Sequence, residues 1–187
     1  MGTPFLVSPD ESLLLVVDMQ ARLAGAMEPT DYQQIRGNVA ILVKAAVLLG
    51  IPLLATEQYP KGLGATDTEL AALFPADLTP IDKTSFSCCA VPDVQTTIAS
   101  SGRHQLLVVG MEAHICVLQT ALELSSQGYS VFVPEDGVCS RNPAHRSNAM
   151  ARMRASGVLV TLTESVLFEW LRDATHEHFK AVTGLLK

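Results

Sequence analysis

Short apolar runs alternate along this sequence with longer stretches of helical periodicity, and this alternation constrains the fold more than any other feature. The runs LLLVV at Leu13–Val17 and QLLVV at Gln105–Val109 are typical of strands buried on both faces. Between them, Ile35, Val39 and Leu42 recur at the spacing of one helix face. The alternation predicts an α/β fold with a mostly parallel sheet covered by helices on both sides. The expected strands are 13–17, 51–55, 79–83, 105–109, 130–134 and 158–162, and the expected helices are 32–49, 67–74, 91–101, 114–127, 142–156, 164–172 and the last dozen residues.

The composition is that of a compact globular chain. Hydrophobic residues make up 48% and charged residues 17% of the 187 residues, which excludes a disordered chain. Because no linker or internal repeat divides the sequence, we expect a single domain over residues 1–187. The formal net charge is −6 and no basic stripe occurs. This argues against a nucleic-acid partner, because such binding depends on clustered Lys and Arg.

The sequence predicts neither export nor membrane insertion. Met1–Asp10 lacks the basic and then apolar pattern of a secretory signal. The longest apolar stretch, 39–55, is interrupted by Lys44, Gly50 and Pro52, so we interpret it as a helix followed by a strand. The four cysteines are spaced neither as a disulfide framework nor as a zinc site. A cytoplasmic protein with reduced thiols is the expectation.

Three chemically useful side chains lie at the predicted ends of strands, where open α/β sheets bind their ligands. Asp18 follows the first strand, Lys83 ends the third, and Cys116 follows the fourth. Cys116 falls in the first turn of a predicted helix, where free N–H groups and the helix dipole predict a lowered thiol pKa. Each residue has a plain alternative role: a small buried hydrophobe for Cys116, a loop cap for Asp18 and a surface position for Lys83.

Together, the three side chains would make a coherent catalytic set. Asp18 can take the thiol proton as a general base, and Lys83 can stabilise both the thiolate and the carboxylate. The N–H groups at the start of the helix that carries Cys116 can hold an oxyanion. We therefore expect the three residues to converge at one edge of the sheet.

Three motifs resemble those of the isochorismatase-like hydrolases. They are VVDMQ at Val16–Gln20, DKTSFS at Asp82–Ser87 and VVGMEAHICVLQTA at Val108–Ala121, of which the third is the most specific. The resemblance continues through SVFVPEDGVCSRNPAHR to TLTESVLFEWL and so covers most of the chain. It implies a three-layer αβα, Rossmann-like fold with a six-stranded, mostly parallel sheet, and it implies a homo-oligomer.

The resemblance also implies a mechanism and the residues that carry it. Cys116 is the implied nucleophile, with Asp18 and Lys83 as its partners, in the hydrolysis of a small amide or related carbonyl substrate through a thioester. A cis peptide bond is implied between Met111 and Glu112. The backbone N–H groups of Glu112 and Cys116 are the implied oxyanion hole.

One segment departs from part of this family. Nicotinamidase-type members carry an Asp and two His that bind a metal after the second strand. Here the segment reads TEQYPKGLGAT at Thr56–Thr66 and has no histidine. We therefore expect no metal, no cofactor and no nicotinamidase activity. The segment most resembles the isochorismatase-domain-containing proteins of unassigned substrate.

Five further residues are candidates for lining a substrate pocket. Gln20, Gln58, Tyr59 and Phe86 follow predicted strands or the motifs that carry Asp and Lys, and loop packing is their alternative role. His114 lies two residues before the cysteine nucleophile. Residues two apart on a helix do not face each other, so we expect His114 at the pocket rim rather than as the base.

Two other functions stay open on the same fold. A scaffold or binding protein would keep the fold while Cys116 performs no reaction, and the intact set of three residues argues against this. A thiol redox sensor would use Cys88, Cys89 or Cys139, although adjacent cysteines seldom form a relaxed disulfide. The leading prediction is a hydrolase of a small molecule, without nucleic-acid or membrane partners.

Overall fold

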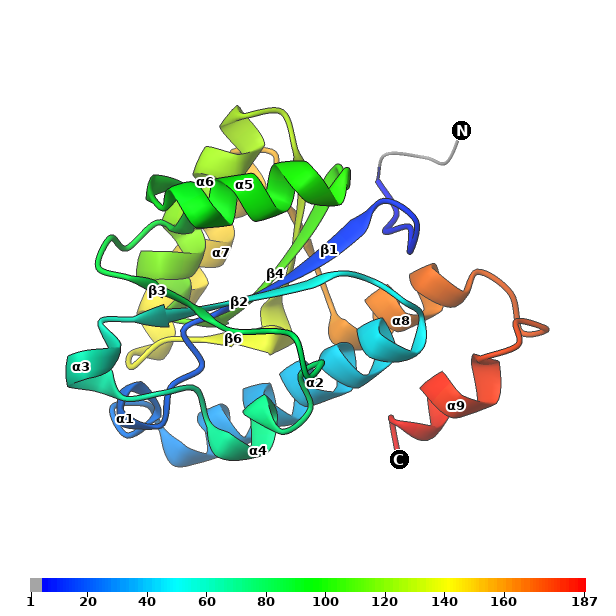
Figure 1. Cartoon of the computed structure of the whole chain (residues 1–187), viewed down its shortest axis with the longest axis horizontal. Coiled ribbons are helices and arrows are strands. Elements are labelled where there is room, and N and C mark those ends of the chain that lie inside the picture. Colours follow the sequence, from blue (N-terminus) through cyan, green and yellow to red (C-terminus); the bar gives the residue numbers. More distant parts are fainter. Residues whose placement is uncertain (1–4) are drawn as a thin grey trace.

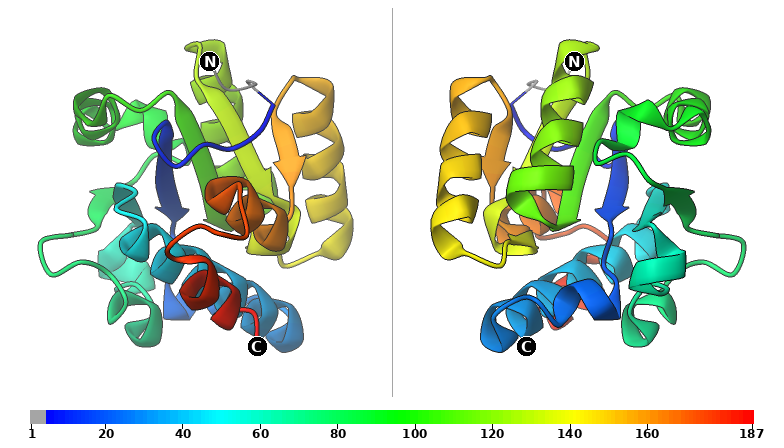
Figure 2. Two further views of the ribbon diagram at one scale, coloured as in Figure 1. Left: turned by 90° about the vertical axis from the view of Figure 1, so that its right-hand side faces the viewer. Right: turned by 90° about the vertical axis from the view of Figure 1, so that its left-hand side faces the viewer.

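A parallel sheet forms the centre of the molecule (Figure 1). The computed structural model describes residues 5–187, so the first four residues of the predicted domain, and of the segment Met1–Asp10, lie outside the described residues. The strands are β1 Ser12–Val17, β2 Leu53–Gln58, β3 Ile81–Lys83, β4 Gln105–Met111, β5 Ser130–Pro134, β6 Val138–Cys139 and β7 Leu159–Thr161. They lie in the order β3-β2-β1-β4-β5-β7, with β6 beside β4, and every strand pairing in the sheet is parallel. In Figure 2 the arrowheads of β1 (blue) and β7 (orange) accordingly point to the same end.

Helices cover both faces of this sheet and so complete three layers (Figure 1). The longer helices are α2 Pro29–Leu48, α5 Pro92–Ser101, α6 Leu118–Ser126, α7 Pro143–Ala155 and α8 Thr163–Leu171. The shorter helical segments are α1 Ala21–Ala24, α3 Pro60–Leu63, α4 Thr68–Ala71, α9 Phe179–Gly184, η1 Cys88–Ala90, η2 Ala113–Val117 and η3 Glu135–Gly137. The predicted α/β architecture is confirmed.

The two helix layers explain why the strands are apolar throughout. Leu14 and Val16 of β1 pack in one core cluster with residues of α2 and α8. Leu13, Leu15 and Val17 pack in the other cluster with residues of α5, α6 and α7. Because alternate side chains of a strand point to opposite faces, both sets must be apolar.

The sheet differs from the sequence prediction in its number of strands and in several strand boundaries. The prediction has six strands, and the two-residue strand β6 is a seventh. The prediction also places the second strand at 51–55, whereas β2 covers Leu53–Gln58. The polar segment Thr56–Gln58 therefore continues the strand instead of starting a loop. Its side chains find hydrogen-bond partners there, so the strand does not need to end where the apolar run ends.

Gly110 allows β1 and β4 to approach closely where both strands end. It pairs with Val17 across the two strands and has a φ of +117°. A Cβ atom added at Gly110 would lie 2.0 Å from the carbonyl oxygen of Val17. Only glycine fits both this backbone conformation and this contact. The close approach brings the residue after β1 next to the segment that follows β4.

Within residues 5–187, no helix has the length and apolar character needed to cross a membrane.

Replacing Gly110 with Ala is expected to lower the free energy of unfolding by roughly 3 kcal/mol or more, because backbone strain and the contact with Val17 add. Gly37→Ala is the matched control: Gly37 is exposed within α2, and its added Cβ would have no atom within 4 Å. This control should raise the free energy of unfolding by about 0.5–1 kcal/mol. Urea denaturation measures both values, and similar small effects of the two changes would contradict the close packing of β1 on β4.

Candidate active site

The three predicted catalytic side chains lie together at the carboxyl edge of the sheet. Asp18 directly follows β1, Lys83 is the last residue of β3, and Cys116 lies in the π-helical turn η2 after β4. The neighbours β1 and β4 are the point where the strand order reverses, which is where open α/β sheets bind ligands. The Nζ atom of Lys83 lies 2.6 Å from Oδ2 of Asp18. Besides burial, the charge of the same carboxylate acts on the thiol of Cys116 and raises its pKa.

Asp18 and Lys83 form an ion pair that is withdrawn from water. Both side chains have 0% of their surface exposed. The Lys83 ammonium also donates to Oε1 of Gln58 at 2.7 Å and to the backbone carbonyls of Ser85 and Phe86 at 3.2 and 3.1 Å. Such partners are needed because an unpaired buried charge is very costly. The alternative of Lys83 as a surface lysine is therefore wrong.

Thr56 is a polar partner of the site that sequence reasoning missed. Its hydroxyl donates to Oδ1 of Asp18 at 2.8 Å, and both residues are buried. Thr56 lies just beyond the end of the predicted strand 51–55, so the prediction gave its side chain no direction. Extending β2 by three residues would have placed Thr56 beside the end of β1, since Val17 pairs with Thr56.

Burial and the ion pair act in opposite directions on the two charges. Burial raises the pKa of the Asp18 carboxyl above its usual value, although the Lys83 charge and hydrogen bonds from Lys83, Thr56 and Cys116 oppose the rise. Burial would lower the pKa of Lys83, but the Asp18 charge and the Cys116 thiol raise it above its usual value. The ammonium therefore stays charged, while Asp18 becomes a stronger base than an exposed aspartate.

The pKa of the Cys116 thiol differs from the sequence prediction. Only 5% of the residue is exposed, and burial, followed by the charge of Asp18, raises the pKa of its thiol to about 12. Lys83 opposes this rise but does not cancel it. The expectation that the helix start would lower the Cys116 pKa is therefore wrong, because burial and a neighbouring carboxylate outweigh the N–H groups of one turn. The resting cysteine is a thiol, and it needs a base in order to react.

The segment between β4 and Cys116 is held by buried polar contacts. The peptide bond between Met111 and Glu112 is cis. The carboxylate of Glu112 is buried and bonded to the Arg141 guanidinium and backbone N–H, and these contacts hold the pKa of Glu112 below its usual value despite the burial that raises it. The carbonyl of Glu112 accepts hydrogen bonds from the N–H groups of Ile115 and Val117. The backbone at the predicted oxyanion hole is thus fixed from both sides.

Gln20 supports the loop after β2. The residue is buried, and its Nε2 donates to the carbonyls of Gln58 and Gly64 at 3.0 and 2.5 Å. Its Oε1 accepts the N–H of Gln58 at 2.8 Å. The polar atoms of Gln20 are therefore committed to the backbone of this loop.

Gln58, Tyr59 and Phe86 lie nearer to solvent. The Oε1 atom of Gln58 lies 4.0 Å from the Cys116 sulfur, and its Nε2 donates to the carbonyl of Thr84 at 2.9 Å. Tyr59 and Phe86 are 53% and 55% exposed. A cavity of about 290 Å³ lies between α3 and the end of β3, lined by Tyr59, Pro60, Lys61, Asp82, Lys83 and Thr84.

His114 contacts Ser140 and His145. Its Nδ1 lies 2.9 Å from the hydroxyl of Ser140, and its ring lies 4.7 Å from the ring of His145. Burial lowers the pKa of His114 below its usual value. The contacts place His114 beside Ser140 and the start of α7.

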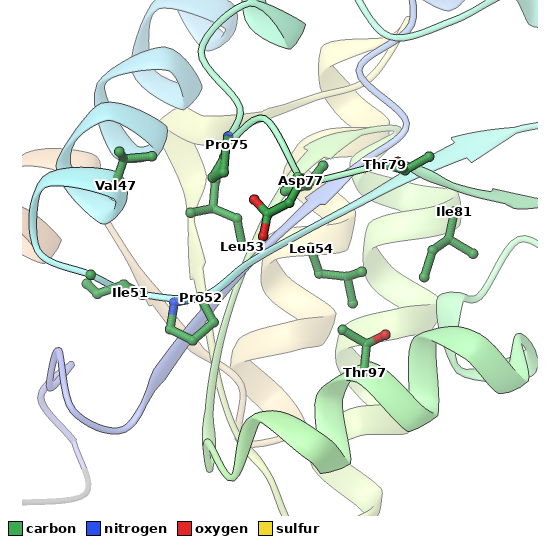
Figure 3. Close-up of a pocket in the computed structure, with 12 residues that line it drawn as sticks. Val47, Ile51, Pro52, Leu53, Leu54, Pro75, Asp77, Thr79, Ile81 and Thr97 are labelled. Carbon is green, nitrogen blue, oxygen red and sulfur yellow. The ribbon is translucent and has the colours of Figure 1, made fainter.

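A larger cavity lies at the opposite end of β2 and does not include the three catalytic candidates. Its volume is about 530 Å³, and it opens between the end of α2, the start of β2 and α5 (Figure 3). Its walls are largely apolar, with Asp77, Thr79 and Thr97 among the polar residues. Nothing in this cavity supplies a nucleophile beside a base.

The remaining cysteines are free thiols. Cys88 is buried, with its sulfur 3.8 Å from the Thr56 hydroxyl, and Cys89 and Cys139 are likewise unpaired with other cysteines. Among the described residues 5–187, no group of three or more His, Cys, Asp or Glu side chains is placed to hold a metal ion.

Comparison with known proteins identifies the family. The isochorismatase domain matches residues 12–165. Isochorismatase domain-containing protein 2 of Danio rerio is 40% identical over 183 residues, which cover 96% of this chain and 89% of the relative. The chain is also similar to the structure of MAR1 ribonuclease from Caenorhabditis elegans, with a TM-score of 0.91 and 34% identity over 97% of this chain and 92% of that one. The YcaC gene product of Escherichia coli, an octameric hydrolase of unknown specificity, gives a TM-score of 0.86 and 25% identity over 97% and 94% of the two chains. The chain therefore belongs to the isochorismatase family.

Proposed function

We propose that the protein is a cysteine hydrolase that cleaves a small amide or related carbonyl compound through a thioester on Cys116. One observation carries this proposal: a buried lysine holds the carboxylate of Asp18 at the strand ends where the Cys116 thiol also lies, and the charge of this carboxylate acts on the thiol. A carboxylate that acts on a buried thiol is suited to serve as the base that activates a nucleophile. The scaffold alternative would leave this costly arrangement without a purpose.

Asp18 acts as general base in the first step. Because the pKa of the thiol is about 12, the proton leaves the sulfur as the sulfur attacks the carbonyl carbon. Asp18 receives this proton, and its raised pKa makes it a better acceptor near neutral pH than an ordinary aspartate. Lys83 stays protonated throughout and holds the carboxylate in position.

The tetrahedral oxyanion is held by the backbone N–H groups of Glu112 and Cys116. Such groups stabilise charge best when they are fixed before the reaction, and the Glu112–Arg141 contacts provide this fixation. Asp18 then gives its proton to the leaving amine, which departs with it. A water molecule attacks the thioester with Asp18 again as base, and this step releases the acid and restores the thiol.

Further features support the rest of the proposal. The similar E. coli protein is an octameric hydrolase, which supports a homo-oligomer here. Four free thiols fit a reducing compartment such as the cytoplasm. The reaction is written without a cofactor, because each of its proton transfers uses Asp18. We propose one catalytic domain over the whole chain.

The similar C. elegans protein is described as a ribonuclease, but we do not extend that activity to this chain. A phosphate backbone requires clustered cations. The net charge here is −6, and the buried Lys83 already has four acceptors.

Hydrolysis of a panel of small neutral and charged amides, followed by amine release, tests the proposed reaction. We expect turnover of at least one panel member. Asp18→Asn, Lys83→Met and Cys116→Ser should each lower kcat/KM by at least about 10³-fold, because each removes part of one catalytic unit. Cys89→Ser is the control, since Cys89 is half-buried and outside the set, and it should retain activity. Full activity of Cys116→Ser would refute the covalent mechanism.

The pH dependence of Cys116 alkylation tests the pairing of base and thiol. The wild-type rate should still be rising above pH 10, as expected for a thiol whose pKa is about 12. Asp18→Asn should move the apparent pKa downward by at least about one pH unit, because it removes the carboxylate while the Lys83 charge remains. Mass spectrometry of the Cys116 peptide provides the rate, and the Cys139 peptide provides an internal reference. An unchanged profile in Asp18→Asn would show that the two groups do not interact.

A further inference from the structure

The ammonium of Lys83 has no hydrogen-bond donor left for a substrate. It can donate three hydrogen bonds, and four oxygens already surround it, those of Asp18, Gln58, Ser85 and Phe86. Its side chain has 0% of its surface exposed. Lys83 therefore cannot serve as the cation that binds a carboxylate or phosphate of the substrate.

The cation beside the predicted oxyanion hole is committed as well. The guanidinium of Arg141 contacts both carboxylate oxygens of Glu112, and the Arg141 backbone N–H donates to the same group at 3.1 Å. This pairing neutralises the positive charge locally.

The charge that acts most strongly on the reacting sulfur is negative. Asp18 affects the Cys116 thiol more than Lys83 does, and the two act in opposite directions. Since Lys83 is paired with Asp18, an anionic substrate would find no uncompensated positive charge at the sulfur to offset the loss of its hydration.

A neutral polar group, the carboxamide of Gln58, lies beside the sulfur. The carboxamide of Gln58 lies between the Lys83 ammonium at 2.7 Å and the Cys116 sulfur at 4.0 Å. Its orientation is fixed by donation to the Thr84 carbonyl at 2.9 Å. Unlike Lys83 it is only partly buried, and the exposed rings of Tyr59 and Phe86 belong to the same loop region.

We propose that the site selects a substrate that is electrically neutral around its reacting carbonyl, and that the Gln58 carboxamide is the specificity-determining contact. This inference rests on the proposed function. It names the substrate class as uncharged carboxamides or related neutral carbonyl compounds, and it excludes compounds with a carboxylate next to the reacting carbon.

Iodoacetamide and iodoacetate test this selection, because they are nearly the same size and differ in charge. With either reagent the Cys116 sulfur forms a bond to the CH₂ carbon as the C–I bond breaks and iodide leaves, and the thiol proton passes to Asp18. The ratio of the two rates at Cys116 is divided by the same ratio for N-acetylcysteine. We expect Cys116 to favour iodoacetamide by at least about tenfold after this correction.

Two variants assign the preference to Gln58. Gln58→Glu adds a negative charge and should increase the corrected preference several-fold. Gln58→Leu should slow iodoacetamide more than iodoacetate, so the preference should fall. Gln127→Glu is the matched control, because it places the same charge at the exposed far end of α6 and should leave the ratio unchanged.

The outcomes separate this inference from the proposed function. Alkylation of Cys116 with a corrected ratio near one, or a ratio unmoved by both Gln58 variants, overturns the charge selection and leaves the nucleophile standing. Full amide hydrolysis by Cys116→Ser contradicts the proposed function itself, whatever the corrected ratio.

Discussion

The buried ion pair between Lys83 and Asp18 is the interaction on which the site depends. It joins the ends of β1 and β3 across β2, and β2 adds Thr56 and Gln58 to the same network. Removing two charges from water is expensive, and the cost is recovered only when every donor and acceptor has a partner. Asp18 even adopts a positive φ of 51° at this position. These constraints on one carboxylate support the catalytic role that we propose for Asp18.

The ion pair also determines how the cysteine can react. The Cys116 thiol does not ionise readily, since burial and the negative charge of Asp18 both raise its pKa. The same carboxylate is well placed to remove the proton during attack. In the proposed mechanism, the thiol therefore loses its proton only when an electrophile arrives, and the resting thiol reacts slowly. This coupling agrees with a site whose remaining surface groups are neutral.

Much of the fold could be predicted because it depends on local patterns. Runs such as LLLVV mark strands covered on both faces, and Asp18 and Cys116 stood out because each follows such a run. Lys83 stood out at the end of the short predicted strand 79–83 and in the motif DKTSFS. The boundary of β2 could not be placed, because Thr56 and Gln58 remain in a strand only through partners distant in sequence. The predicted lowering of the Cys116 pKa was wrong for a similar reason. The helix start is a local feature, whereas burial and the Asp18 charge arise from tertiary structure. The coordination of Lys83 by backbone carbonyls has no signal in the sequence.

A double-mutant cycle on the free energy of unfolding tests the role of the buried pair most directly. Asp18→Asn and Lys83→Met should each lower stability by about 3–5 kcal/mol, because each leaves one buried group without its partner. The double variant should lose less than the sum of the two, by at least about 2 kcal/mol, since it removes both groups together. Losses that add to within about 0.5 kcal/mol would mean that the two side chains do not depend on each other, and this would contradict the central place given to the pair.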